Sequence, residues 1–136
     1  MITYRQGNDL DLDAMIELYH ASTLGERRPS DDRSRMSEML KQANLVVTAW
    51  DGELLVGISR ALSDFSFVTY LSDLAVRKSH QRCGIGKELI RRTQQAAGTQ
   101  AKLILVAAPA AAEYYPRIGF QYLTRAWILE AGESLR

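Results

Sequence analysis

The residues best suited to chemistry lie in one short stretch, residues 81–87, which reads Gln-Arg-Cys-Gly-Ile-Gly-Lys. Its two glycines, Gly84 and Gly86, let the backbone approach a ligand closely and adopt conformations that other residues avoid. Apolar residues at helical spacing follow, and they predict a helix over residues 85–97. Because the first N–H groups of a helix have no partner within it, they are suited to binding an anion. The stretch therefore predicts an anion-binding loop at the start of a helix.

Positive charge is concentrated in the same place. From Arg77 to Arg92 there are six basic residues and one acidic residue, which gives a local net charge of +5, whereas the whole chain carries +1. This concentration favours phosphate as the anion. Two familiar phosphate loops are excluded, because a Walker loop requires Ser or Thr where Glu88 stands and a dinucleotide fingerprint requires glycine where Leu89 stands. The simplest alternative is a glycine-containing turn that leads into a solvated helix.

The elements on either side predict where this loop lies in the fold. Residues 68–76 are β-branched, aromatic and aliphatic, as in a largely buried strand, and residues 102–107 read as a strand buried on both faces. The order strand, helix, strand predicts a right-handed crossover and a parallel pair, residues 68–76 beside 103–107. Ligands of open α/β sheets bind beyond the carboxyl ends of such strands. The glycine loop begins at such an end.

Two motifs carry a resemblance to a known family. The spacing Gln81-x-x-Gly84-x-Gly86 after a strand resembles the acyl-CoA loop of the Gcn5-related N-acetyltransferase (GNAT) superfamily, which reads Gln or Arg, two residues, Gly, one residue, then Gly or Ala. Residues 114–120, Tyr-Tyr-Pro-Arg-Ile-Gly-Phe, are similar to a second superfamily segment, an aromatic residue and a tyrosine followed by three residues and Gly-Phe. The resemblance covers residues 45–129, and the earlier residues match only in the order of their elements.

The resemblance implies a fold and a cofactor. The fold class is α/β, with a central, mostly antiparallel sheet that contains one splayed parallel strand pair and is flanked by about four helices, all in one domain over residues 1–136. The cofactor is acetyl-CoA, used as the acyl donor, without a metal. In the superfamily the pantetheine arm pairs with the first of the two splayed strands, and the pyrophosphate is held by the glycine loop. The residues expected to bind the cofactor are Leu74, Ala75, Val76, Gln81, Arg82, Cys83, Gly84, Ile85, Gly86 and Lys87.

Other details of the cofactor site stay open. The 3′-phosphate of CoA would meet one of four basic side chains, from Lys78, Arg82, Lys87 and Arg91. Many superfamily members carry an asparagine that contacts the cofactor arm at the place where this chain has Ala108. The thiol of Cys83, at a helix N-terminus and three residues from His80, could be reactive. A backbone contact to the cofactor explains its position better than covalent catalysis does.

Transfer of an acetyl group to an amine requires a group that accepts the amine proton, because an alkyl ammonium with a pKa of about 10.4 is mostly protonated at neutral pH. Asp73, the nearest carboxylate on the strand before the loop, is the candidate base. An equal alternative is that Asp73 is a structural polar residue at a sheet bulge, with its hydrogen bonds satisfied. A chain of water molecules could also accept the amine proton. Tyr115, by its place in the second motif, is implied to be the general acid near the thioester sulfur. The alternative for Tyr115 is a tyrosine that packs beside Tyr114.

The rest of the chain reads as ordinary secondary structure. We expect helices from Asp9 or Asp11 to about residue 23 and over residues 32–43, the second capped by Ser30 or Asp31. In the superfamily this helical pair lies beside the acceptor site, although a solvated loop is the simpler interpretation of its charged connection. The residues in question are Arg27, Arg28, Asp31, Asp32 and Arg33.

Strands over residues 45–50 and 53–59 are predicted to form an antiparallel hairpin around an Asp51-Gly52 turn. Gly57 within the second strand indicates a bulge or a close neighbour. A short helix over residues 110–118 should be kinked or shortened by Pro116. Closing strands are predicted over residues 120–122 and 125–129.

Composition sets the broad class. Hydrophobic residues make up 46% and charged residues 24% of the 136, which is ordinary for a soluble globular protein. A single cysteine excludes an internal disulfide, and no apolar run approaches the roughly 20 residues of a membrane helix. A cytoplasmic location and no membrane partner are the corresponding expectations. A net charge near zero argues against a general nucleic-acid binder.

The sequence thus predicts an N-acetyltransferase that moves an acetyl group from acetyl-CoA to a primary amine of unknown identity by direct attack. Two rivals from other classes remain. One is an acyl-CoA-binding sensor module without turnover, and the other is a nucleic-acid-binding domain that uses residues 77–92. The acceptor amine cannot be read from the sequence, and a homodimer is left open.

Overall fold

A computed structural model describes all 136 residues of the chain. They form two compact units, Met1–Val106 and Ala107–Arg136, which are described separately below. The first unit contains the sheet and the glycine loop. The second contains the Tyr-Tyr-Pro-Arg-Ile-Gly-Phe motif.

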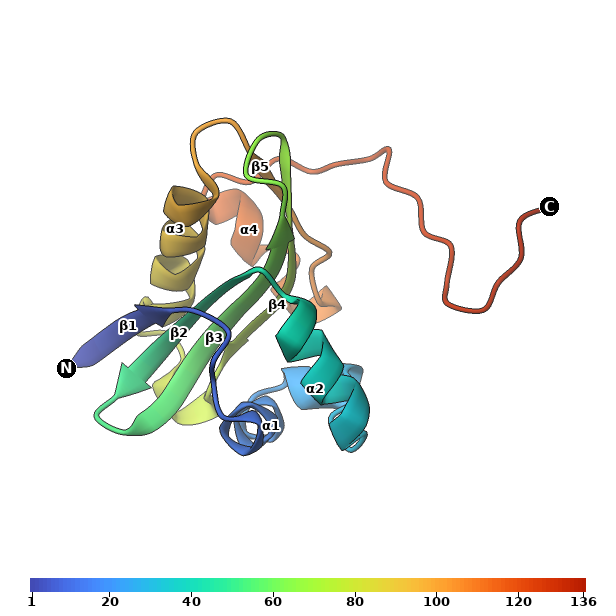
Figure 1. Ribbon diagram of the computed structural model, residues 1–136. Helices are drawn as coiled ribbons and strands as arrows, with labels where there is room; N and C mark the ends of the chain where they lie inside the picture. Colours follow the sequence, from blue (N-terminus) through green and yellow to red (C-terminus); the bar gives the residue numbers. More distant parts are fainter. The chain divides into compact units, whose positions relative to one another are not determined.

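The first unit is built on a five-stranded mixed sheet with the strand order β1-β2-β3-β4-β5 (Figure 1). Neighbouring strands are antiparallel except β4 and β5, which are parallel, as the sequence predicted. The predicted mixed α/β fold class is therefore confirmed. The strands are β1 (Ile2–Gln6), β2 (Leu45–Asp51), β3 (Leu54–Ser63), β4 (Val68–Val76) and β5 (Lys102–Ile104).

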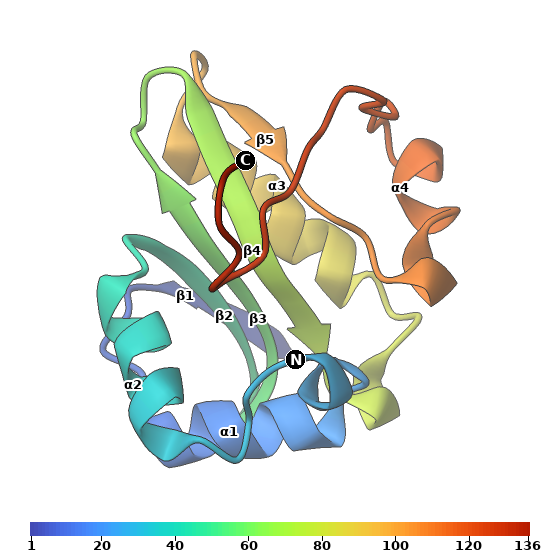
Figure 2. The ribbon, with the colours of Figure 1, turned by 90° about the vertical axis from the view of Figure 1, so that its right-hand side faces the viewer.

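Helices cover both faces of this sheet (Figure 2). Helices α1 (Leu12–Ala21) and α2 (Arg33–Gln42) pack against Val46, Ile58 and Ala75 on one face. Helix α3 (Ile85–Ala97) packs against Val47 and Val56 on the other face. Consecutive strand residues such as Val46 and Val47 belong to different apolar clusters, because side chains alternate between the two faces of a strand. The short helical turns η1 (Leu24–Arg27) and η2 (Lys78–His80) connect these elements.

Local chemistry decides where the first two helices begin. Helix α1 is capped by Asp11, one of the two predicted caps, whose carboxylate accepts a hydrogen bond from the N–H of Ala14 at 3.1 Å. Helix α2 is capped by Asp32, whose carboxylate accepts from the N–H of Arg35 at 3.1 Å. The predicted caps Ser30 and Asp31 are therefore one or two residues too early.

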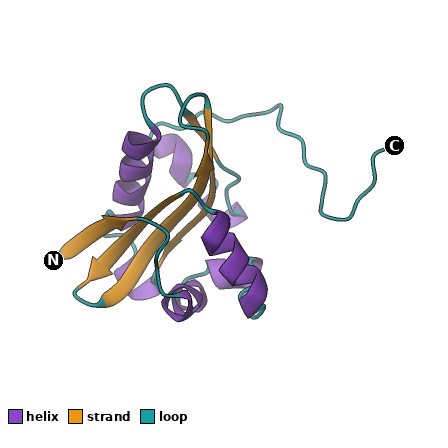
Figure 3. Cartoon of the chain, in the orientation of Figure 1, coloured by secondary structure: helices purple, strands orange, loops and turns teal.

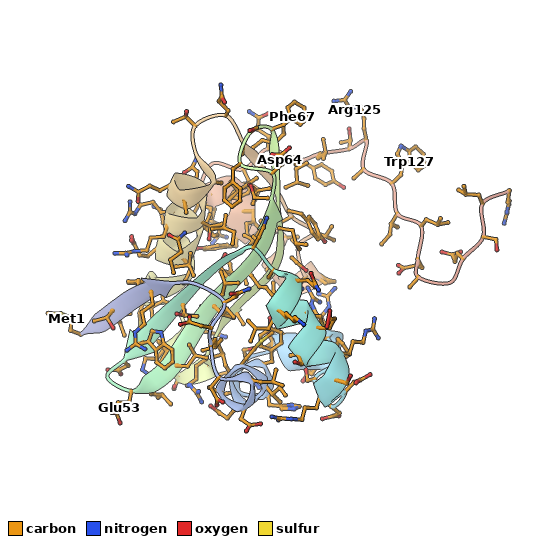
Figure 4. The ribbon with its side chains drawn as sticks, in the orientation of Figure 1. Met1, Glu53, Asp64, Phe67, Arg125 and Trp127 are labelled. Carbon is orange, nitrogen blue, oxygen red and sulfur yellow. The ribbon has the colours of Figure 1, made fainter.

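The β2–β3 hairpin is confirmed with a small shift. Asp51 pairs with Leu54, so the two turn residues are Gly52 and Glu53 rather than Asp51 and Gly52, and Gly52 takes the positive φ of +61°. Figure 4 shows Glu53 at this turn, with Asp64 at the opposite end of β3. Gly57 meets both predictions made for it, because the β2–β3 register shifts beside it and a Cβ there would lie 2.9 Å from Leu89 of α3. Glycine at this position therefore lets α3 pack closely on the sheet.

The second unit contains two short helical segments, η3 (Pro109–Ala111) and α4 (Tyr114–Arg117). The predicted helix over residues 110–118 is thus interrupted at residues 112–113, and the part that contains Pro116 is a single short turn, in line with the predicted shortening. The predicted closing strands over residues 120–122 and 125–129 are not formed, and these residues are coil (Figure 3). Trp127, which Figure 4 labels on this segment, is 96% exposed. A strand requires a hydrogen-bonding neighbour, which the sequence pattern alone does not supply.

No helix in the chain is both long enough and apolar enough to span a lipid bilayer.

Candidate active site

The parallel strand pair diverges, and this leaves part of β4 with one free edge. Strands β4 and β5 pair only from Val68 to Tyr70, opposite Lys102 to Ile104. The β3–β4 register shifts between the pairs Arg60–Asp73 and Ala61–Leu71, which makes Ser72 a bulge residue. From residue 71 to residue 76, β4 therefore pairs with β3 alone. A peptide-like ligand can add to such an edge through main-chain hydrogen bonds.

The glycine loop follows this free edge after one helical turn, η2. The side-chain amide of Gln81 donates a hydrogen bond to the carbonyl of Val76 at 2.9 Å, which holds the loop against the end of β4. Arg82 and Gly84 both take left-handed conformations, with φ of +64° and +84°. A non-glycine residue with positive φ, such as Arg82, is uncommon and clusters at functional sites.

The loop presents a row of unpaired backbone donors. Within the chain, no acceptor is bonded to any of six consecutive N–H groups, and the first bond of α3 runs from Glu88 to the carbonyl of Gly84 at 3.1 Å. Alternating backbone conformations of this kind form concave anion sites, and the N-terminus of α3 adds its dipole. The unpaired donors are those of Arg82, Cys83, Gly84, Ile85, Gly86 and Lys87.

Ion pairing reduces the number of free cations near this loop. Arg77 pairs with Glu17 of α1. Arg91 and Arg92 both bind Glu88, and these hydrogen bonds, that of Arg91 first, lower the pKa of Glu88 from 4.5 to about 2. The basic side chains left without an acidic partner are Lys78, Arg82 and Lys87. The local charge is thus less extensive than the sequence suggested, but it remains positive at the row of free N–H groups.

Cys83 and His80 do not form a catalytic pair. The Cys83 thiol is exposed and contacts the carbonyl of Gln81 at 3.4 Å. The His80 ring contacts the Ser79 hydroxyl at 2.7 Å and the Asp51 carboxylate at 2.9 Å, so both ring nitrogens are engaged elsewhere. No group of three or more His, Cys, Asp and Glu side chains is placed to hold a metal ion.

The other predicted cofactor residues have core side chains. Ala75 packs against the α1–α2 cluster, whereas Leu74 and Val76 pack against the cluster that contains Ile85. Ile85 is only 3% exposed. Leu74 and Val76 are only partly buried, whereas Ala75 and Ile85 are buried and can offer a ligand only their backbone atoms.

Asp73 occupies a different environment from that expected of a general base. Its side chain is fully buried and receives three hydrogen bonds of 2.6 Å, from the guanidinium groups of Arg28 and Arg60 and from the Tyr19 hydroxyl. Arg60 itself is 8% exposed and also donates to the Ser72 hydroxyl at 2.9 Å. Both carboxylate oxygens are therefore occupied, and neither can reach an amine.

The charges of this cluster stabilise one another. Burial raises the pKa of Asp73, but the hydrogen bond and charge of Arg60, with the bonds from Tyr19 and Arg28, outweigh it, so the pKa lies below 3.8. Burial lowers the pKa of Arg60, and the hydrogen bond and charge of Asp73 reverse the effect, so its pKa is raised. Asp73 therefore matches the alternative interpretation, a polar residue at a sheet bulge whose hydrogen bonds are satisfied. We no longer assign Asp73 as the general base.

The partners of Asp73 were not foreseen, although one signal was present. Arg60 is the one charged residue of β3, a mostly buried strand, and a charged residue is buried only if it is paired. Asp73 interrupts β4 in the same way. Because each is a lone charge in a buried strand, Arg60 and Asp73 could have been predicted to pair with each other. Nothing local marks Tyr19 or Arg28, which are 54 and 45 residues away from Asp73.

Tyr115 lies in the second unit, where it is half-buried. Its ring makes edge-to-face contacts with Tyr114 and Phe120, at centroid distances of 5.3 and 5.4 Å. Burial, with a smaller contribution from Tyr114, raises the pKa of Tyr115 above 10. The hydroxyl therefore stays protonated at neutral pH and can donate a proton or a hydrogen bond.

Comparison with known proteins gives one family and one fold. Residues 21–129, more than half of the chain, match the family model of the acetyltransferase (GNAT) domain. None of the curated proteins matches the sequence. A GNAT-family acetyltransferase from Streptococcus pneumoniae is 24% identical with a TM-score of 0.72, covering 95% of this chain and 98% of that one.

Two further structures share the fold. A probable acetyltransferase from methicillin-resistant Staphylococcus aureus is 21% identical with a TM-score of 0.76, covering 96% of this chain and 99% of that one. The aminoglycoside N-acetyltransferase AAC(6')-Iy, solved in complex with CoA, is 20% identical with a TM-score of 0.73, covering 96% of this chain and 94% of that one. A second structure of AAC(6')-Iy contains the bisubstrate analogue CoA-S-monomethyl-acetylneamine.

Proposed function

The chain belongs to the GNAT acetyltransferase family, and on that premise we propose that it moves an acetyl group from acetyl-CoA to a primary amine by direct attack. The observation that carries the proposal is the row of six unpaired N–H groups at the start of α3, which follows the free edge of β4 after the turn η2. This row suits a pyrophosphate, and the free edge suits the amide-containing pantetheine arm. A nucleotide with a peptide-like arm fits both features at once.

Different residues of the chain would bind different parts of the cofactor. The backbone of Leu74, Ala75 and Val76 would pair with the arm, and the backbone of residues 82–87 would hold the pyrophosphate. Lys78, Arg82 and Lys87 are the cations without an acidic partner, so one of them would meet the 3′-phosphate. Arg91 is a weaker candidate for that role because Glu88 already binds its guanidinium at 2.6 Å.

The chemical step forms a C–N bond between the amine and the acetyl carbonyl carbon and breaks the C–S bond. The amine gives up its proton, and the CoA thiolate leaves and takes one up. Since both carboxylate oxygens of Asp73 are buried and hydrogen-bonded to other side chains, we propose water as the acceptor of the amine proton. A thiol with a pKa of about 8.5 leaves tolerably as the thiolate, so a general acid helps the departure without being obligatory.

Tyr115 is the proposed general acid, and its raised pKa keeps the required proton in place at neutral pH. We expect Tyr115→Phe to lower kcat roughly tenfold to a hundredfold, at or below the lower end of the usual contribution of a general acid. The Kd for acetyl-CoA should change less than threefold. Steady-state kinetics and calorimetry measure the two quantities.

Tyr114→Phe is the matched control, because it removes the hydroxyl of the exposed neighbouring ring. It should leave kcat within twofold of the wild-type value. An unchanged kcat in Tyr115→Phe would exclude Tyr115 as the acid and leave it with a packing role.

Release of free CoA thiol tests the proposed function. The purified protein is incubated with acetyl-CoA and, separately, with spermidine, neamine, a lysine-containing peptide and free amino acids, and the thiol is followed with a chromogenic disulfide. At least one amine should raise the rate well above that of acetyl-CoA alone. Mass spectrometry should then show an added acetyl group on that amine.

A non-catalytic acyl-CoA sensor is the second candidate, favoured by the lack of an accessible carboxylate at Asp73. A sensor would bind acetyl-CoA in calorimetry and release no thiol with any amine. Binding to DNA or RNA that CoA does not displace would instead support the nucleic-acid alternative. A cytoplasmic location and a homodimer stay predictions.

A further inference from the structure

Arg28 joins the connection between α1 and α2 to the bulge of β4. Its Nε donates to Asp73 at 2.6 Å, one terminal nitrogen donates to the carbonyl of Ser72 at 2.8 Å, and the other donates to the carbonyl of Arg27 at 2.8 Å. No other side chain between residues 22 and 32 bonds to β4. Arg28 is therefore the one polar link between this connection and the strand.

The connection itself is folded tightly. The hydroxyl of Ser30 donates to the carbonyl of Gly25 at 3.1 Å, and that of Ser22 donates to the carbonyl of Tyr19 at 3.0 Å. A Cβ at Gly25 would lie 2.6 Å from the backbone oxygen of Tyr19, so the segment lies directly against the end of α1. Leu24 of this segment packs against the core cluster that contains Ala75 of β4, and Arg28 adds the hydrogen bonds that fix the segment to the bulge.

The point that Arg28 contacts is where the acyl group of the proposed cofactor would end. An arm that starts at the glycine loop must run back along β4 from Val76, because the free edge extends in that direction only. The gap between β4 and β5 ends at Tyr70, which pairs with Ile104. The acyl end of the arm therefore falls near Ser72, and the four residue-to-residue steps from Val76 back to Ser72 span about 13 Å.

We propose that Arg28 is a positioning residue for acetyl transfer, which holds the α1–α2 connection as the wall against which the acceptor amine binds. This inference rests on the proposed function and adds a determinant of acceptor binding to it. Arg60 cannot take this role, since it is buried beneath the bulge and bonds to Met39 of α2 and to Ser72. Arg28 is the member of the cluster that reaches the surface, with its side chain 24% exposed.

The test combines hydrogen–deuterium exchange with kinetics on three variants. Arg28→Ala removes all three bonds. Arg28→Lys keeps the charge beside Asp73 but carries its donors on one nitrogen, so it lacks the planar fork with which Nε and the two terminal nitrogens each reach a different acceptor. Arg35→Ala is the control, because Arg35 is exposed on α2 and its side chain makes no hydrogen bond. The amine used is the panel member with the highest kcat/KM.

We expect the amides of residues 24–30 to exchange at least tenfold faster in Arg28→Ala than in the wild-type protein. The KM for the amine should rise at least tenfold, while the KM for acetyl-CoA changes less than twofold. Arg28→Lys should be intermediate, and Arg35→Ala should match the wild type in all three measurements. A residue that merely contributes to stability would not separate the two KM values.

Two other results would overturn the proposal. One is unchanged exchange of residues 24–30 in both Arg28 variants, which needs no substrate and is decisive even if no amine is acetylated. The other is an amine KM that stays within twofold of the wild-type value or rises in parallel with the acetyl-CoA KM. By contrast, wild-type protein that acetylates no amine would refute the proposed function, whatever the exchange data show.

Discussion

Gly86→Glu is expected to weaken acetyl-CoA binding at least a hundredfold in a protein that remains folded. The new carboxylate would stand in the first turn of α3, among the six N–H groups that have no partner. It would compete for those donors and repel the pyrophosphate. An acidic residue near a helix N-terminus stabilises the helix, so the melting temperature should not fall. Calorimetry gives the Kd, and thermal unfolding monitors the fold.

Gly86 is a cleaner position for this test than Gly84. Gly84 has a φ of +84°, so any side chain there strains the backbone, whereas Gly86 does not have a positive φ. Gly86→Ala is the matched control, because it adds a Cβ without charge and should weaken binding less than tenfold. Micromolar affinity retained in Gly86→Glu would refute the assignment of the loop to the cofactor.

Asp73→Asn is expected to lower the free energy of unfolding by about 3–5 kcal/mol at pH 7, the usual effect of removing one partner from a buried ion pair. The substitution keeps the shape of the side chain but leaves Arg60, 8% exposed, without a counter-charge. Denaturant unfolding followed by circular dichroism measures the change. Asp31→Asn, at a side chain 98% exposed, is the control and should change the value by less than about 0.5 kcal/mol.

The lowered pKa of Asp73 also predicts how this loss of stability changes with pH. Because the pKa of Asp73 in the folded protein lies below 3.8, its contribution is fully present above that value and is lost as the pH falls through the folded pKa. The difference between the wild type and Asp73→Asn should thus be constant from pH 6 to 8 and shrink in acid. A loss of stability under about 1 kcal/mol at pH 7 would show that Arg60 finds other partners and that the cluster is not a tightly coupled unit.

Several parts of this molecule were determined by local sequence. The bounds of β4 and α3 were predicted as Val68–Val76 and Ile85–Ala97, because a buried strand and an amphipathic helix each carry their own apolar period. The glycine loop between them could be predicted for the same reason, since the left-handed conformation of Gly84 depends on its lack of a Cβ. The family assignment followed from these residues and from the second motif.

Tertiary structure alone decided the role of Asp73 and the extent of the last strands. A carboxylate on a strand fits a base and a structural charge equally well. The partners of Asp73 come from three separate parts of the chain, with Tyr19 in α1, Arg28 in the α1–α2 connection and Arg60 in β3. β5 is shorter than its apolar run, and residues 120–129 form no strand despite a suitable pattern. Apolar periodicity describes what one segment can do, whereas charge pairing and strand pairing depend on which distant segment lies beside it.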